Sequence, residues 1–510
     1  MISVFYIKIR NFEKFFCKKE FNYVIVVKVW KFFEFLLIYY IYVEVFKMSS
    51  MASSASNRID SLLDEKSFVE IGSAIKARAT DFNLKQVDTP SDGVITGYGT
   101  IDGNRVYVYS QDSSVLGGSI GEMHAKKIVN LYDLAIKTGT PVIGLIACSG
   151  LRLQESTDAL NALGEIYYKQ SMAKGLVPQI AAVFGNCGGG LALIPSIADF
   201  TLVEEKNGKL FVNSPDALDG NYSAKCDTAS ADFQAKECGT VDFTGDEASV
   251  LDTIRTLISM LPQNNEDVAL SESDDDLNRK CAGLAGFKGD TAALLATIAD
   301  NNDFLEVKAA YAKDMVTGFI KLDGLTVGCV ANRTEILGDD GKASEKFEAR
   351  LSVNGCLKAA DFVDFCDSFG IPILTVTNAE GFKACMCSEK RIASAASTLT
   401  QAFANCDVPR VNLVVGKAFG SAYVTMNSKA LGCDLTYAWP TAEIGTMDAK
   451  LAAGIMYAGE SQDTINAKAA EYAKLAGSAA SAAERGYVDT VIDPDDTRKH
   501  LVYAFEMLFA

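Results

Sequence analysis

The chain has 510 residues, of which 49% are hydrophobic and 22% are charged, a composition typical of a globular protein with an ample core. Its length allows two domains of about 220 to 240 residues each. The formal net charge of −17 at pH 7 argues against nucleic acid as a partner, because no basic surface would attract phosphates.

The thirteen cysteines and two histidines bear on metal and disulfide chemistry. The closest cysteine pair is Cys385 and Cys387, and no CxxC spacing occurs anywhere. Structural zinc sites need clusters of Cys and His at close spacing, so we predict no metal site. We interpret the cysteines as reduced core residues of a cytoplasmic protein.

Residues 1–47 differ in composition from the rest of the chain. They contain fifteen aromatic residues and no Gly, Ala, Pro or Asp. They lack the compact apolar core and small-residue cleavage site of a signal peptide. After residue 20, their longest uncharged run is Phe35 to Val43, whereas a membrane-spanning helix needs about 18 residues. Since A+T-rich codons encode Phe, Ile, Tyr, Lys and Asn, we predict a spurious or disordered extension before a start at Met48 or Met51.

The next segments alternate between helical and extended patterns. Residues 57–72 (NRIDSLLDEKSFVEIG) predict an amphipathic helix and a turn into extended structure. Residues 93–110 alternate apolar and polar side chains around the turn at 101–104, which is typical of a β-hairpin. A helix over 121–138, a buried strand over 141–147, a helix over 156–174 and a strand over 179–184 follow. This alternation indicates α/β organisation.

The second half of the chain repeats this order. The acidic, structure-poor residues 262–278 predict a linker or long loop. Beyond them, the expected elements are a hairpin over 318–330 around Asp323-Gly324, a helix over 358–369, a strand over 372–377, a helix and a strand over 411–415. The shared order predicts a duplication, with domains at 48–275 and 276–510.

Each half also contains a glycine-rich turn between an apolar run and a segment that can open a helix. The turns lie in residues 182–195 (AVFGNCGGGLALIP) and 411–426 (VNLVVGKAFGSAYVTM). Such a turn leaves backbone N–H groups unpaired and available to an oxygen that carries negative charge. The alternative is close strand–helix packing that requires small residues. The paired occurrence favours two anion-stabilising sites.

Several motifs, in the same order, resemble the carboxyltransferase family of biotin-dependent acyl-CoA carboxylases and decarboxylases, of propionyl-CoA carboxylase β and methylmalonyl-CoA decarboxylase α type. The resemblance extends from Arg58 to Leu508. The matching stretches are RIDSLLDEKSFVEIG, GVITGYGTIDGNRVYVYSQD, GGSIGEMHAKKI and GNCGGGLALIP in the first half, and YAKDMVTGFIKLDGLTVGCVAN, DFCDSFGIPILTV, GKAFGSAYVTMNSKALGCD, AWPTAEIGTM and AAERGYVDTVIDP in the second.

This resemblance implies an α/β fold of two crotonase-like ββα-spiral domains. It implies a homo-oligomer, either a dimer or a trimer of dimers, with active sites at the dimer interface. The first domain of one subunit would bind acyl-CoA and face the second domain of another, which would receive biotin. The family's reaction moves CO2 between biotin and the α-carbon of a short-chain acyl-CoA, such as propionyl-CoA or methylmalonyl-CoA.

Two oxyanions form in that reaction, the thioester enolate and the ureido oxygen of biotin. Each needs N–H donors about 2.7 to 3.1 Å away in a site shielded from water, and neither needs a metal or a protein nucleophile. By resemblance, the N–H groups of Gly189 and Gly190 stabilise the enolate, and those of Ser421 and Ala422 stabilise the biotin oxygen. The predicted substrate-binding residues are Gly117, Gly118, His124, Lys126, Lys127, Arg152, Gly188, Phe419 and Gly420.

Four of these side chains have structural alternatives. His124 is a candidate acid–base, but we favour a helix histidine that hydrogen-bonds a neighbour, since the mechanism needs no imidazole. Lys126 and Lys127 either pair with CoA phosphates or lie on a solvated helix face. Arg152 either binds phosphate or orders the loop before a helix. Cys187, beside the first turn, is interpreted as a small apolar filler.

The chain departs from the family pattern on the biotin side. It has Gly420-Ser421-Ala422 where the family has Gly-Gly-Ala, and residues 383–399 (KACMCSEKRIASAASTL) replace the usual segment before the turn. It also lacks a biotin-attachment Met-Lys-Met and an ATP-binding module. Expected partners are therefore a biotin carboxyl carrier protein and either a biotin carboxylase or a membrane decarboxylase subunit.

Three alternatives stay open at this point. The enzyme could run as the carboxyltransferase subunit of a sodium-pumping acyl-CoA decarboxylase, in the opposite direction to a carboxylase. It could be a different crotonase-fold acyl-CoA enzyme, in which the second turn would be idle. It could also be a non-catalytic partner of a true carboxyltransferase.

Overall fold

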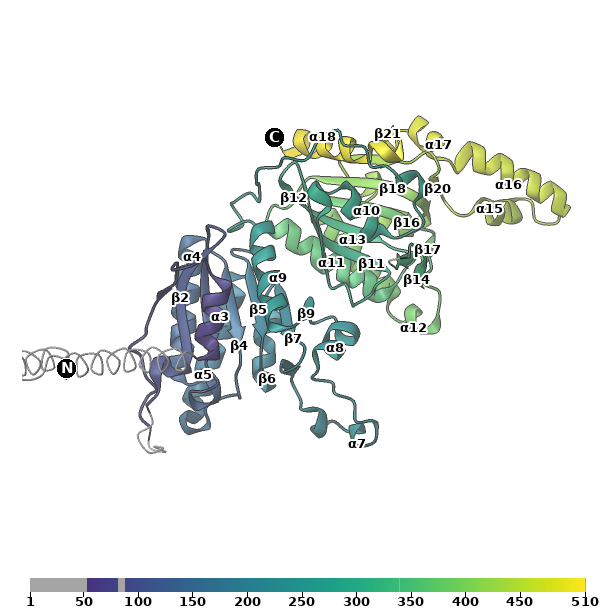
Figure 1. Cartoon of the computed structure of the whole chain (residues 1–510). Coiled ribbons are helices and arrows are strands. Elements are labelled where there is room, and N and C mark those ends of the chain that lie inside the picture. The colour runs from purple at the N-terminus through teal and green to yellow at the C-terminus, as the bar shows by residue number, and fades with distance from the viewer. Residues whose placement is uncertain (1–52, 81–87, 339, 510) are drawn as a thin grey trace, which may run out of the picture. The chain divides into compact units, whose positions relative to one another are not determined.

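The computed structural model describes residues 53–80, 88–338 and 340–509, and Figure 1 labels their helices and strands. The prediction for residues 1–47 lies outside these residues. Arg58–Ala510 forms one compact unit. Within it the chain builds two large sheets, one from each half of the sequence.

The first sheet has seven strands in the order β1-β2-β3-β4-β5-β7-β9. The first two pairings are antiparallel and the remaining four are parallel. Strands β6 and β8 form a separate parallel pair. The strands of this half are β1 (Val69–Glu70), β2 (Val94–Ile101), β3 (Asn104–Gln111), β4 (Val142–Ile146), β5 (Gln179–Val183), β6 (Asn186–Gly188), β7 (Phe200–Glu204), β8 (Lys209–Phe211) and β9 (Phe243–Gly245).

The second sheet follows the order β10-β11-β12-β16-β18-β19-β21, with β20 paired to β18. Its pairings are again two antiparallel and then four parallel along this path, which confirms the repeated order predicted from the sequence. The strands are β10 (Phe304–Val307), β11 (Met315–Leu322), β12 (Leu325–Asn332), β13 (Glu335–Leu337), β14 (Ala343–Lys346), β15 (Arg350–Leu351), β16 (Ile373–Ala379), β17 (Gly381–Phe382), β18 (Arg410–Phe419), β19 (Leu435–Ala438), β20 (Glu443–Gly445) and β21 (Thr490–Val491).

Helices α4 and α5 pack on each other beside the first sheet, and α11 and α13 do so beside the second (Figure 1). The α-helices of the first half are α3 (Ser54–Leu62), α4 (Glu122–Thr138), α5 (Ser156–Ala173), α6 (Leu193–Ile197), α7 (Asn221–Ala224), α8 (Ala231–Phe233) and α9 (Glu247–Met260). Those of the second half are α10 (Thr291–Ile298), α11 (Val353–Ser368), α12 (Met386–Glu389), α13 (Ile392–Asn405), α14 (Gly420–Thr425), α15 (Ala449–Met456), α16 (Gln462–Ala476), α17 (Ala479–Glu484) and α18 (Thr497–Phe509).

The two predicted hairpins are confirmed, and their turns explain why. Asp102 and Gly103 join β2 to β3 with φ of 49° and 82°, and Asp323 and Gly324 join β11 to β12 with φ of 52° and 76°. A two-residue hairpin turn with both central φ positive matches the twist of the strands, and Asp-Gly adopts it readily. Both halves therefore use the same Asp-Gly hairpin turn between the second and third strands of their sheets.

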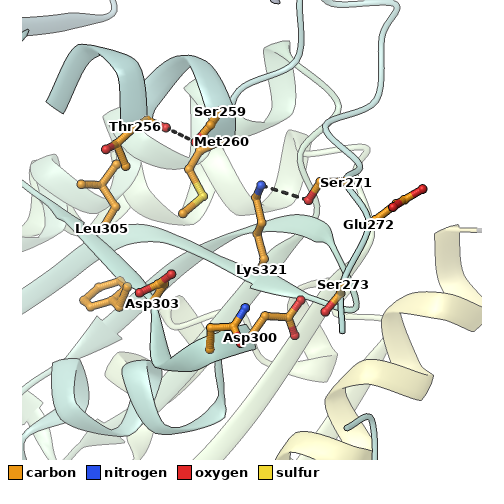
Figure 2. Close-up of a pocket in the computed structure, with 12 residues that line it drawn as sticks. Thr256, Ser259, Met260, Ser271, Glu272, Ser273, Asp300, Asp303, Leu305 and Lys321 are labelled. Atoms are coloured by element: carbon orange, nitrogen blue, oxygen red, sulfur yellow. Dashed lines mark hydrogen bonds between the residues drawn. The ribbon is translucent and has the colours of Figure 1, made fainter. Parts of the chain in front are cut away.

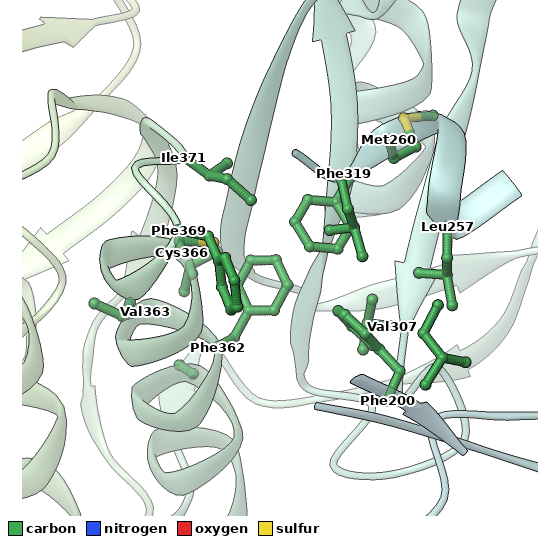
Figure 3. Close-up of a cluster of buried hydrophobic side chains, with 14 of the residues drawn as sticks. Phe200, Leu257, Met260, Val307, Phe319, Phe362, Val363, Cys366, Phe369 and Ile371 are labelled. Atoms are coloured by element: carbon green, nitrogen blue, oxygen red, sulfur yellow. The ribbon is translucent and has the colours of Figure 1, made fainter. Parts of the chain in front are cut away.

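A hydrophobic cluster connects the two halves (Figure 3). The Phe200 ring on β7 lies 4.9 Å from that of Phe365 on α11 and 6.1 Å from that of Phe319 on β11, centroid to centroid. Leu257 and Met260 of α9 belong to the same cluster. Because buried aromatic pairs add to the free energy of area burial, this cluster ties the sheets together.

Of the remaining predictions from the sequence, some are confirmed and others are wrong. Residues 262–278 form no helix or strand, as expected of a loop. The strand predicted at 411–415 is too short, since β18 continues to Phe419 by pairing with β20. The twelve described cysteines are free, but Cys226, Cys238, Cys385 and Cys387 are exposed, so a core role for these four is wrong. In the described ranges, no helix is both long and apolar enough to cross a bilayer.

Candidate active site

The first glycine turn follows β5. After β6 the chain makes a short 3-10 helix over Gly189–Ala192 that leads into α6. The N–H groups of Gly189 and Gly190 precede the first hydrogen bond of this helix, and Gly189 directly follows the β6–β8 ladder, in which Gly188 is in register with Phe211. Gly189 has φ of +64°, and a Cβ built on it would meet open space. Gly189 therefore borders open space, whereas a Cβ on Gly190 would lie 2.9 Å from the Tyr167 hydroxyl.

Neighbouring side chains hold this turn in place. The Tyr167 hydroxyl of α5 donates to the Gly190 carbonyl. A Cβ on Gly188 would lie 2.5 Å from the Phe211 ring, so only glycine fits there. Cys187 is fully buried and its thiol donates to the Leu191 carbonyl over 3.4 Å. Burial raises the pKa of Cys187, which fits the apolar filler and disfavours a thiolate.

The second turn follows β18, which occupies the position in the second sheet that β5 occupies in the first. Phe419 ends the strand and caps α14, and Gly420 begins the helix with φ of +59°. The N–H groups of Ser421 and Ala422 lie in the first turn of α14, before the first hydrogen bond within that helix. Ala422 is buried, whereas Ser421 is exposed. The second turn, like the first, begins a helix at a glycine with positive φ.

Gly117 and Gly118 fix the loop that follows β4. The Ser149 N–H donates to the Gly117 carbonyl over 3.0 Å, and both glycines have positive φ, of 68° and 64°. A Cβ on Gly118 would lie 2.4 Å from the Ala147 carbonyl oxygen. The close backbone approach requires glycine at this position.

Arg152 is buried and bound within the chain. Its Nη1 lies 2.6 Å from Asp92 Oδ1 and 2.9 Å from Glu155 Oε1, and its Nη2 donates to the Ser119 carbonyl over 2.8 Å. Burial raises the pKa of Asp92, although the facing Arg152 opposes that rise. These contacts favour the loop-ordering alternative for Arg152 over a phosphate ligand.

His124 belongs to the same buried network. Its Nδ1 lies 2.9 Å from the Asp92 carbonyl oxygen and its Nε2 lies 3.1 Å from Gln111 Nε2. Nδ1 therefore carries the proton and Nε2 accepts. Gln111 Oε1 accepts from the Ala147 N–H over 3.2 Å. Burial lowers the pKa of His124 to about 3, so the ring is neutral. This neutral, buried ring favours the interpretation of His124 as a helix histidine that hydrogen-bonds a neighbour.

The two lysines of α4 have different surroundings. Lys127 is buried, and its Nζ donates to the Ser91 carbonyl over 3.0 Å and to the Val94 carbonyl. The solvated face expected as its alternative is therefore wrong, and its amine is engaged within the chain. Lys126 is exposed and pairs with Glu122 at 2.7 Å, so both readings stay open for it.

Sequence reasoning missed Asp92, Glu155 and Tyr167. The two carboxylates meet Arg152 only through the fold, and Tyr167 follows the ordinary helical spacing of α5. No local motif marks any of the three. The sequence could suggest only that Arg152 pairs with a distant Asp or Glu, because a buried arginine needs a counter-charge.

A cavity of about 430 Å³ is lined by residues of neither turn (Figure 2). Thr256, Ser271, Asp300 and Asp303 line it together with Lys321, whose Nζ donates to Ser271 Oγ over 3.0 Å. Burial lowers the pKa of Lys321. None of the predicted catalytic or substrate-binding residues lines this cavity. Within the described residues, no group of three or more His, Cys, Asp or Glu could hold a metal ion.

Comparison with known families decides the relationship of this chain. The carboxyl transferase domain matches residues 52–510. The chain belongs to that family. It is 36% identical over 474 residues to the methylmalonyl-CoA decarboxylase subunit alpha of Propionigenium modestum, covering 89% of this chain and 90% of the relative. It is 37% identical over 471 residues to the propionyl-CoA carboxylase beta chain of Roseobacter denitrificans, with the same shares covered.

Solved structures of the family agree with this assignment. The crystal structure of transcarboxylase 12S with methylmalonyl-CoA and methylmalonic acid bound superposes with a TM-score of 0.83 and 34% identity. The match covers 91% of this chain and 92% of the other. This carboxyl transferase chain is therefore an enzyme of mixed α/β fold, and the resemblance drawn from its motifs is confirmed.

Proposed function

We propose that the chain is the carboxyltransferase that moves CO2 between biotin and the α-carbon of a short-chain acyl-CoA of the propionyl- or methylmalonyl-CoA type. One observation carries the proposal: two glycine turns, each of which begins a helix, follow equivalent strands of two repeated sheets. The names of the relatives supply the substrate class. Biotin, on a separate carrier protein, supplies the nitrogen that carries CO2.

The first turn acts on the acyl-CoA. The N–H groups of Gly189 and Gly190 donate to the thioester oxygen as it becomes an enolate, and Gly188 and the Tyr167 contact hold them in position. Donors fixed before reaction avoid reorganisation when the charge develops. Of the other residues predicted to bind substrate, exposed Lys126 is the one available to a CoA phosphate. His124, Lys127 and Arg152 position the loops from within.

The second turn acts on biotin. The residues present fit a ureido oxygen, because Ser421 and Ala422 place two N–H groups in the first turn of α14. The exposed Ser421 side chain narrows the approach. The donors stabilise the oxygen after CO2 leaves the nitrogen.

The repeated strand order supports two crotonase-like ββα-spiral domains over 48–275 and 276–510. Transcarboxylase 12S is described as a hexamer assembly in a multienzyme core. By analogy, this chain forms a cytoplasmic homo-oligomer in which the first turn of one subunit faces the second turn of another. Its partners are a biotin carboxyl carrier protein and either a biotin carboxylase or a membrane decarboxylase subunit.

The test is incubation of the purified protein with methylmalonyl-CoA and either biotin or a biotinylated carrier, followed by loss of the substrate's CO2. Transfer to biotin with formation of propionyl-CoA is expected. Absence of decarboxylation and transfer with every short acyl-CoA would refute the proposal. The relative named methylmalonyl-CoA decarboxylase favours running the reaction from the acyl-CoA toward biotin as a second candidate. A preference for propionyl-CoA with carboxylated carrier would favour the carboxylase direction instead.

A further inference from the structure

A charged cluster beside the second glycine turn takes no part in the function proposed above. It consists of Arg350, Glu380 and Lys417, and we call it the ion triad. Lys417 Nζ lies 2.8 Å from Glu380 Oε2, and Arg350 Nε lies 3.3 Å from Glu380 Oε1. One carboxylate therefore joins two cations from strands β15 and β18.

Backbone pairing places the triad at the end of β18. Arg350 is in register with Gly381 in the parallel β15–β17 pair. The Lys417 N–H donates to Asn378 Oδ1 over 3.0 Å, and the Glu380 N–H donates to the Ala349 carbonyl over 2.7 Å. Lys417 stands two positions before Phe419, the cap of α14. The triad is thus fixed next to the turn by the strands themselves.

The triad leaves cationic donors unused. Arg350 donates through Nε, whereas its Nη1 and Nη2 have no partner among the described residues. Lys417 Nζ has one partner for its three N–H groups in the same part of the chain. Their side chains are 38% and 44% exposed. Pairs this exposed contribute about 0–1 kcal/mol to stability, whereas spare guanidinium and ammonium donors bind anions well.

All three groups are charged at neutral pH. The hydrogen bond from Lys417 lowers the pKa of Glu380, and the same bond raises the pKa of Lys417. Glu443, in register with Lys417 on β20, is exposed and also raises that pKa. The triad itself carries one net positive charge, Glu443 and Asp448 are two further carboxylates that act on Lys417, and the unused donors all belong to the two cations.

We propose that Arg350 and Lys417 form a binding site for a carboxylate that reaches the second turn during carboxyl transfer, with Glu380 as the positioning residue. The inference rests on the proposed function. The carboxylate has two sources with the same chemistry: the carboxyl group carried on biotin, or an acidic side chain of the carrier protein. A planar guanidinium beside an ammonium suits either one.

The site is tested first without turnover. Calorimetric titration with malonate, which has two carboxylates and no ureido ring, compares the wild type with Lys417→Met and Arg350→Met. Loss of a charge-assisted hydrogen bond is expected to weaken malonate binding about tenfold. Lys468→Met removes a lysine that pairs with Glu471 on α16 and is the matched control, expected to bind malonate as the wild type does. Equal malonate binding by all variants, or none by the wild type, overturns the proposal.

Turnover then identifies the source. In the direction from biotin to propionyl-CoA, the KM for N-carboxylated biotin amide, whose only carboxylate is the transferred one, is compared with the KM for the carboxylated carrier. If Lys417→Met raises the KM in both arms, the carboxylate bound at the site is the carboxyl group on biotin. If it raises the KM with the carrier alone, the bound carboxylate is an acidic side chain of the carrier protein. Glu380→Gln is expected to give a smaller rise that Glu380→Asp recovers. An unchanged KM in both arms overturns the role in transfer. If the wild type transfers no carboxyl group, the proposed function is refuted. The malonate titration still tests whether Arg350 and Lys417 bind a carboxylate.

Discussion

Arg152 Nη1 lies 2.6 Å from Asp92 Oδ1, and both side chains are almost completely excluded from solvent. Asp92 belongs to the short 3-10 turn before β2, and Arg152 belongs to the loop after β4. Asp92 also accepts from the His124 N–H over 2.8 Å, at the start of α4. A single carboxylate thereby connects a strand, a helix and the loop that packs against Gly117 and Gly118.

Removal of the Arg152 charge should be costly. In Arg152→Met, Asp92 and Glu155 lose their shared cation while staying buried, and an uncompensated buried charge costs about 3–5 kcal/mol. Denaturant unfolding would measure this loss. Arg78→Met is the control, because Arg78 is 45% exposed in its pairs and such pairs contribute about 0–1 kcal/mol. Equal losses in the two variants would show that burial of the Asp92 pair has no energetic consequence.

The neutral His124 ring predicts a pH dependence of stability. Its folded-state pKa of about 3 lies below the unfolded value of 6.5, so the unfolded chain binds an extra proton as pH falls below 6.5. Proton uptake by His124 on unfolding therefore lowers the free energy of unfolding of the wild type by about 2 kcal/mol between pH 7.5 and 5. Asp199, with its pKa raised to about 7 by burial, acts with the opposite sign in both proteins.

The His124→Gln variant should therefore lack this pH-dependent loss of stability. The difference in the free energy of unfolding between wild type and variant is expected to narrow as pH falls from 7.5 to 5, and parallel unfolding curves at both pH values would measure it. A difference that stays constant would mean that the pKa of His124 is the same in the folded protein as in the unfolded chain.

The fold was predictable where local chemistry decides it. The Asp-Gly turns, the alternation in β2 and the apolar run of β5 all locate their elements correctly. The end of β18 was not predictable, because its last residues pair with β20, which comes later in the chain. The same holds for Lys127, whose helical spacing indicates a surface residue although backbone carbonyls of the β2 region surround its amine.

The candidate site divides in the same way. Glycines mark both turns in the sequence, since positive φ at Gly189 and Gly420 leaves a local signature. The ion triad has no such signature, because Arg350, Glu380 and Lys417 come from three separate segments. Long-range pairing of single charges leaves no periodic pattern in the sequence.

Gly189→Val tests the enolate donors. A side chain there meets no atom within 4 Å, so the main structural cost is positive φ, about 1–2 kcal/mol. Turnover should fall by about 10²–10³-fold as the donors move or become covered. Gly103→Val is the matched control, since Gly103 also has positive φ, of 82°, and open space around its Cβ. Steady-state assays and thermal unfolding of both variants measure the effect, and equal turnover in the two would exclude the Gly189 turn from the reaction.

Ser421 tests the biotin side, where the chain departs from the family pattern. Its side chain is exposed in the first turn of α14, so Ser421→Gly should keep full turnover and lower the KM for the biotinylated carrier. Ser421→Val should raise that KM about tenfold, which corresponds to about 1.4 kcal/mol of lost binding. Ser394→Val, at an exposed position of α13, controls for a valine on a helix surface. Because the first turn is untouched, the KM for acyl-CoA should stay constant in all three variants. A rise in the acyl-CoA KM alone would instead assign Ser421 to the acyl-CoA side of the reaction.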